Sequence, residues 1–113
     1  MGRSRYVITE VDKPHFLTCT VVDWLPIFTQ TAVVQIIFDC WTYQRQQQGL
    51  KLYGYVIMEN HLHFVAQATR LDKVVHSFKS FTARSILDYL QRQHQEHWLS
   101  CMRLAKIAHK IDR

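Results

Sequence analysis

Apolar residues along the chain follow two patterns, one typical of strands and one typical of helices. Residues 15–22 (HFLTCTVV), 50–58 (LKLYGYVIM) and 61–68 (HLHFVAQA) are short, apolar and rich in β-branched or aromatic residues, which predicts strands. Glu59 and Asn60 separate the last two segments, and Asn tolerates the left-handed backbone angles of a tight turn. We therefore expect residues 50–58 and 61–68 to form an antiparallel hairpin.

Three longer segments have apolar residues at helical spacing: 29–48, 69–93 and 96–110. Gly49 is suited to end the first helix, and Thr69-Arg70-Leu71-Asp72 predicts a capping box with Thr69 as N-cap of the second. The order strand, helix, strand, strand, helix, helix is that of a split β-α-β unit of ferredoxin-like type. The expected fold class is α+β, with an antiparallel sheet, helices on one face and a single domain spanning 1–113.

A ferredoxin-like sheet normally has four strands, and the pattern supplies three clear ones. Either residues 5–11 (RYVITEV) form the fourth strand, or it lies beyond Arg113. The last five residues, 109–113 (HKIDR), contain no cap, glycine or proline. We therefore expect the domain to be truncated at its C-terminus.

Composition narrows the class of protein. The chain has 113 residues, 48% hydrophobic and 20% charged, which is typical of one globular domain. Its apolar runs are shorter than the ~18 residues of a membrane helix, and no signal core follows the N-terminus. Cys19, Cys40 and Cys101 are widely spaced, so we expect free thiols in the reducing cytoplasm. Because the apolar runs are short, we also expect no membrane contact.

The net charge of +5 comes entirely from the second part of the chain. Residues 1–69 contain five basic and five acidic residues, whereas residues 70–113 contain nine and four. Either a polyanion binds there or the basic residues form a solvated face, and charge alone favours neither. The candidate phosphate contacts on or beside the exposed side of the 69–93 helix are Lys73, Lys79 and Arg84, and the basic character continues at Arg92, Arg103, Lys106 and Lys110.

The sequence His61-Leu62-His63 places two imidazoles on one face of a strand, because alternate residues point the same way. Two neighbouring imidazoles can bind one divalent cation, although the motif alone is weak. A second group, His94, His97 and Cys101 with His109 farther on, has ligand types at helical spacing but lacks a nearby partner pair, so zinc there is the weaker hypothesis.

The hairpin YVIMENHLHFV (55–65) resembles the metal-site hairpin of the HUH single-strand DNA transposases. It is most similar to the REP-associated tyrosine transposases and their insertion-sequence-200-like relatives. FLTCTVV (16–22) is similar to the family's first strand, and FKSFTAR (78–84) to the helix after the HUH strand. The resemblance covers about residues 14–92. It implies a ferredoxin-like fold, a homodimer, and a substrate of single-stranded DNA next to a folded hairpin.

The resemblance also implies a mechanism. Two His residues, here His61 and His63, and a third polar ligand hold Mg or Mn, which polarises the scissile phosphate. A tyrosine then attacks phosphorus, and the covalent intermediate allows cleaved DNA to be rejoined. In the family this tyrosine and the third ligand lie well downstream. Tyr89 is the only Tyr after the HUH strand, and its position between Ile86 and Leu90 favours a packed aromatic over a nucleophile.

We therefore expect this chain to hold the metal-binding half of the site without the family's nucleophile. One alternative is a non-catalytic nucleic-acid-binding protein, in which Tyr53, Tyr55 and Phe64 stack on bases. Tyr53 and Tyr55 alternate on their strand, so we expect them to share a face, where they either pack on the sheet or flank the metal site. Another alternative is a structural dimer with a vestigial, domesticated site.

Overall fold

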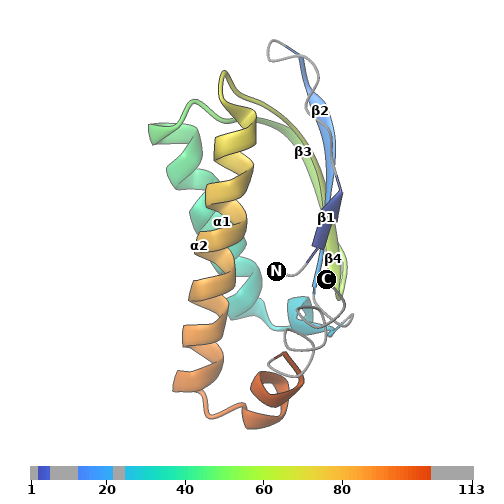
Figure 1. Cartoon of the computed structure of the whole chain (residues 1–113), viewed down its shortest axis with the longest axis vertical. Coiled ribbons are helices and arrows are strands. Elements are labelled where there is room, and N and C mark those ends of the chain that lie inside the picture. Colours follow the sequence, from blue (N-terminus) through green and yellow to red (C-terminus); the bar gives the residue numbers. More distant parts are fainter. Residues whose placement is uncertain (1–2, 6–12, 22–24, 103–113) are drawn as a thin grey trace, which may run out of the picture.

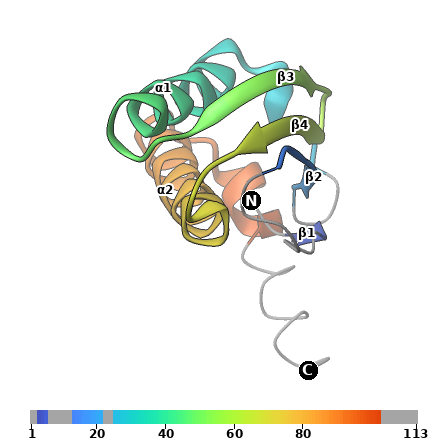
Figure 2. The ribbon, with the colours of Figure 1, turned by 90° about the horizontal axis from the view of Figure 1, so that it is seen from above.

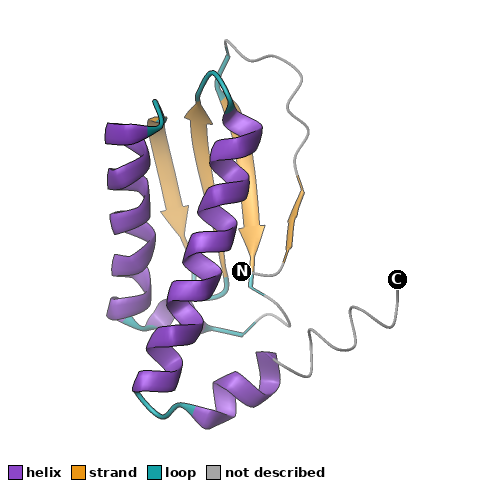
Figure 3. Cartoon of the chain, turned by 60° about the vertical axis from the view of Figure 1, so that its left-hand side comes forward, coloured by secondary structure: helices purple, strands orange, loops and turns teal. Residues whose placement is uncertain are grey.

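A computed structural model of the chain describes residues 3–5, 13–21 and 25–102. Two layers make up the fold, an antiparallel sheet and a pair of long helices that cover one face of it (Figure 1). The opposite face of the sheet carries no helix in the described part of the chain (Figure 3). This is the α+β class expected from the sequence, with helices on one face.

The sheet has the strand order β1-β2-β4-β3, and every neighbouring pair is antiparallel. β2 (His15–Thr20) and β3 (Lys51–Ile57) are joined through a helix, and β4 (His61–Gln67) lies between them. This arrangement is the predicted split β-α-β unit. The short strand β1 (Arg3–Arg5) pairs with β2 at the edge of the sheet. Most of the fourth strand proposed at 5–11 lies outside the described residues.

The helices are α1 (Thr31–Gln47), preceded by the 3₁₀ helix η2 (Ile27–Thr29), and α2 (Leu71–Arg92). They lie beside each other against the sheet, as the view from above shows (Figure 2). A further helical segment occupies residues 96–102, and the rest of the predicted 96–110 helix is outside the described residues. Gly49 has φ +67°, the left-handed conformation predicted for the residue that ends α1.

Aromatic rings join the two layers in the core. Trp41 of α1 stacks on Phe78 of α2, with ring centroids 5.5 Å apart, and both contact Phe64 of β4. The strands contribute residues from one face only, because side chains alternate along a strand. The buried strand residues are Leu17, Cys19, Leu62, Phe64 and Ala66.

The predicted capping box is wrong. α2 begins at Leu71 with Arg70 as N-cap, and no side chain caps the helix. Asp72 instead lies 3.9 Å from Nε of Arg70, a solvent-exposed ion pair that contributes little to stability. The turn after β4 therefore places Thr69 one residue too early to cap the helix.

The expectation that Tyr53 and Tyr55 share a face is also wrong. The pairing of β3 with β4 shifts between Leu52 and Gly54, which marks a β-bulge at Tyr53. A bulge inserts one extra residue into a strand. The residues after it therefore point to the opposite face from the one that regular alternation would give them. The hydroxyl of Tyr53 donates to Oε1 of Gln67, while the ring of Tyr55 contacts Trp41 on the helical side.

Candidate metal centre

His61 and His63 lie on the sheet face that the helices leave uncovered. Their neighbours Leu62 and Phe64 are buried on the helical side, while both histidines are half-buried. The imidazole centroids are 5.0 Å apart. Two imidazoles that share an ion at metal–nitrogen distances of about 2.1 Å have centroids roughly 4.5–5.2 Å apart. The prediction that the two rings lie on one face, close together, is confirmed.

The ring of His63 is held by two residues of β2. Thr18 is its cross-strand partner, and Nδ1 of His63 lies 2.9 Å from Oγ1 of Thr18. Phe16 stacks on the same imidazole, with centroids 5.3 Å apart and planes at 22°. The Thr18 hydroxyl can accept a hydrogen bond from Nδ1–H, and in the tautomer that donates it the lone pair of His63 is on Nε2.

The ring of His61 has a similar arrangement at the turn before β4. Its Nδ1 lies 2.8 Å from Oδ1 of Asn60. An amide oxygen only accepts hydrogen bonds, so Nδ1 of His61 is the donor and the lone pair is on Nε2. In both histidines, therefore, an outer partner fixes the ring through Nδ1, as is usual for imidazoles that bind metals.

The donor set suits a divalent cation with two protein ligands. Within the described residues no cluster of three His, Cys, Asp or Glu side chains is present. Two imidazole nitrogens leave the remaining coordination positions of an ion to water or to oxygens of a substrate. An ion held there would polarise a bound phosphate, the Lewis-acid role of an open metal site.

The three predicted phosphate contacts on α2 do not share one face. Lys73 and Arg84 are exposed, and their spacing of eleven residues, three helical turns, aligns them on one side. Lys79 is half-buried, and its charge interacts electrostatically with Cys19 of β2. Burial raises the pKa of the Cys19 thiol to about 11, and the positive charge of Lys79 opposes that rise.

Tyr89 packs against the core on the helical side of the sheet, as the sequence favoured. The imidazoles alternate along β4 with buried Leu62 and Phe64, so they lie on the face of the sheet opposite to the helices. Within the chain, therefore, Tyr89 is not positioned to act on a phosphate at His61 and His63. Phe64, proposed as a stacking residue, is 2% exposed and is excluded from that role.

The weaker zinc group is only partly assembled. His97 and Cys101 lie on one helical segment, with Nε2 and Sγ 3.9 Å apart. His94 precedes that segment in a turn, at φ 54°, and so does not share its helical face. His109 lies outside the described residues. Cys19, Cys40 and Cys101 are all free thiols, as predicted.

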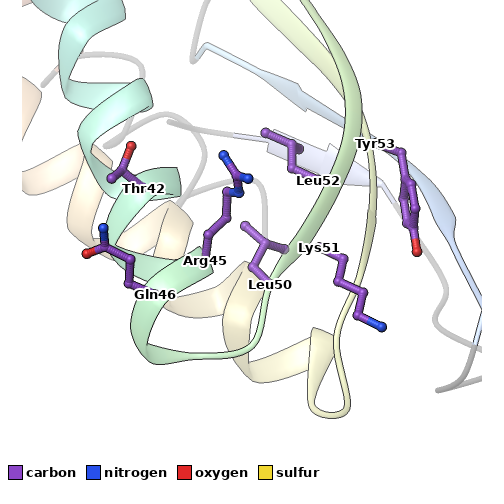
Figure 4. A pocket seen from close by; sticks show the side chains of 7 residues that line it. All are labelled: Thr42, Arg45, Gln46, Leu50, Lys51, Leu52 and Tyr53. Carbon is purple, nitrogen blue, oxygen red and sulfur yellow. The ribbon is translucent and has the colours of Figure 1, made fainter.

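A separate cleft of about 520 Å³ lies between the end of α1 and the start of β3. The side chain of Arg45 extends into the space between α1 and β3, and Tyr53 lies on the other side of β3 (Figure 4). Leu52 and Tyr53 leave β3 on opposite sides, as consecutive residues of a strand do. The cleft is lined by Thr42, Arg45, Gln46, Leu50, Lys51, Leu52 and Tyr53.

Sequence reasoning missed three residues around the imidazoles: Phe16, Thr18 and Asn60. Phe16 and Thr18 are about 45 residues from His63 in the chain, and only the register of β2 with β4 brings them together. Asn60 was recognised as a turn residue, and its hydrogen bond to the next side chain could have been anticipated from its position.

Among the described residues, none of the helices has the length and apolar character needed to cross a membrane. Searches of curated proteins and of solved structures found no match. The sequence profile of the family described as "Transposase IS200 like" matches residues 14–102, which include all of β2, β4 and α2. The chain therefore belongs to the IS200-like transposase family.

Proposed function

We propose that this domain binds single-stranded or hairpin DNA on the uncovered face of its sheet, beside a divalent cation held by His61 and His63. The observation that carries the proposal is the pair of imidazoles at 5.0 Å on a face without helices. Family membership supplies the class of substrate. In the proposal the domain acts in the cytoplasm as a homodimer.

Charge supports a polyanionic substrate. The four described strands contain no Asp or Glu, and they contain Arg3, Arg5 and Lys51 besides three histidines. A sheet without carboxylates does not repel phosphates. Lys73 and Arg84 add exposed positive charge on α2. Phosphate contacts of this kind supply affinity without reading sequence.

The cation would be Mg or Mn, held by Nε2 of His61 and of His63. When bound, it supplies Lewis-acid polarisation of a phosphodiester. The protein's part is to hold the two rings in place through the contacts of Nδ1 with Thr18 and Asn60. Phosphate oxygens of the DNA would then complete the coordination.

β3 supports the homodimer, because it is the last strand of the sheet and its outer edge is unpaired within the described residues. Strands at a sheet edge can pair with a second copy. Several exposed apolar side chains accompany this edge: Tyr53, Tyr55, Val56 and Met58. Sedimentation velocity across a range of protein concentrations tests the dimer, and a monomer at all concentrations would contradict it.

The complete family reaction would cleave and rejoin DNA through a phosphotyrosine. The position of Tyr89 favours the second candidate for this chain, non-catalytic binding of DNA, since the sheet separates its ring from the imidazoles. We expect labelled hairpin DNA incubated with the chain and Mn to give no Tyr89-dependent covalent adduct on a denaturing gel. An adduct that disappears in Tyr89→Phe would identify Tyr89 as the nucleophile and contradict this placement.

Fluorescence anisotropy of a labelled single-stranded oligonucleotide tests the binding itself. We expect the affinity to fall as salt rises, because bound phosphates release counterions. Removal of a basic residue that contacts phosphate lowers the slope of log K against log salt by about 0.7. Lys73→Ala and Arg84→Ala are expected to do so, and Lys79→Ala, on a half-buried residue, is expected to change the slope less.

Lys13→Ala is not a suitable control, since Lys13 lies only two residues before β2, which carries part of the proposed surface. His76→Ala, on the exposed side of α2, removes neither a lysine nor an arginine and is the better control. Binding that does not depend on salt, or equal binding of a neutral polymer, would contradict the proposal.

A further inference from the structure

Phe16 is the most exposed large apolar side chain of the described residues, with 66% of its surface accessible. It lies near the start of β2 and faces away from the helices, next to buried Leu17, which faces them. Most of its surface therefore gains no hydrophobic stabilisation from burial within the described fold. The accessible part of the ring is available to a partner.

The ring of Phe16 is already ordered by the metal centre. It stacks on the imidazole of His63 at 5.3 Å, with the two planes only 22° apart. Nδ1 of that imidazole is in turn held by Thr18. A flat ring that is fixed in place and exposed is a surface on which another flat ring can stack at little cost in side-chain entropy.

The neighbouring surface fits a nucleic acid strand. Phe16 pairs across the sheet with Val65. Val65 lies two residues after His63 on β4, a separation of about 7 Å along a strand. Thr18 and Val65 are half-buried neighbours on the same face, and Val56 beyond them is exposed. The absence of Asp and Glu from the described strands leaves the surface open to phosphates.

We infer that Phe16 is the platform on which one unpaired nucleobase stacks, next to the phosphodiester at His61 and His63. This rests on the proposed function and adds a subsite to it. A base inside a duplex has both faces covered by its neighbours, so only an unpaired base can use the ring. Phe16 thereby selects single-stranded DNA at the metal centre through stacking, which tolerates any base sequence.

An abasic scan locates the contact. Fluorescence anisotropy is measured with a set of hairpin oligonucleotides whose single-stranded flank lacks one base at a time. With the unmodified chain, we expect one abasic position to weaken binding by about fivefold to a hundredfold, the size of one base–aromatic contact. In Phe16→Ala the intact oligonucleotide is weakened by a similar factor, and the abasic position causes no further loss.

Two variants separate stacking from other roles of the ring. Phe16→Trp keeps an aromatic face and is expected to retain the effect of the abasic position, while Phe16→Leu keeps only the apolar character and loses it. Phe81→Ala is the matched control, because Phe81 is 54% exposed and lies on α2. Each variant is also titrated with Mn in the absence of DNA, since a ring that served only to orient His63 would alter that titration.

The outcomes distinguish base stacking on Phe16 from DNA binding by the domain as a whole. If the chain binds single-stranded DNA but Phe16→Ala binds every oligonucleotide as tightly as the unmodified chain, the platform is refuted and DNA binding stands. If duplex and single-stranded DNA bind equally, the platform is likewise refuted. If Phe16→Ala changes the sedimentation of the chain and not its DNA affinity, a second copy covers the ring. If no DNA binds at all, both proposals fail.

Discussion

The two faces of the sheet are built from the same strands and differ in nearly every physical respect. On the helical face, Leu62 and Phe64 are completely or almost completely buried among aromatic rings. On the other face, His61 and His63 alternate with them and make polar contacts to Asn60 and Thr18. The comparison teaches that one strand can separate stability from chemistry by a shift of a single residue.

The clearest test of this difference between the two faces is to measure the stability of the protein with substitutions at adjacent residues of β4. Phe64→Ala removes a ring that contacts both Trp41 and Phe78, so the free energy of unfolding is expected to fall by about 3–5 kcal/mol. His63→Ala, one residue earlier on the other face, is expected to lower it by no more than about 1 kcal/mol. Urea denaturation followed by tryptophan fluorescence measures both values, and equal losses would contradict a division of roles between the faces.

A smaller effect, a loss of Mn affinity, tests the role of the polar contacts on the uncovered face. Removal of an outer partner of a metal ligand typically lowers metal affinity by about 10- to 100-fold, so Thr18→Val is expected to weaken Mn binding by that factor in calorimetry. His61→Ala and His63→Ala should each reduce it further, because they remove a ligand. His76→Ala is the control, as an exposed histidine on α2.

Thr20→Val provides a matched comparison for that experiment. Thr20 pairs with His61 across the strands, but its hydroxyl has no hydrogen-bond partner among the described residues. It is expected to leave Mn affinity unchanged. The same loss in Thr18→Val and Thr20→Val would mean that the strand surface, and not the hydrogen bond to His63, governs the affinity.

Much of the fold is encoded in local patterns. Strand β4 was predictable because it is a short apolar segment that follows a turn, and the alternation of side chains along a strand gave the common face of the two histidines. Gly49 ended α1 as expected, since a glycine accommodates positive φ. Most predictions that depend only on residues close in sequence were confirmed, and the capping box at Thr69 is the exception.

The remainder depends on pairings between distant segments. The β-bulge at Tyr53 depends on the register of β3 with β4. Gly54, between two tyrosines, was a sequence signal from which a bulge could have been predicted. Thr18 and Phe16 became part of the site only through the register of β2 with β4. The half-buried state of Lys79 depends on how α2 packs over Cys19, which helical spacing alone does not specify.

The central position of β4 has a consequence for the thermodynamics of ligand binding. Its backbone is hydrogen-bonded to β2 on one side and to β3 on the other, while it packs on both helices through Phe64. Such a strand opens only when much of the domain unfolds, so its conformation is preorganised before any ligand arrives. An ion or phosphate that meets His61 and His63 therefore orders little further backbone, and more of the intrinsic interaction remains as affinity.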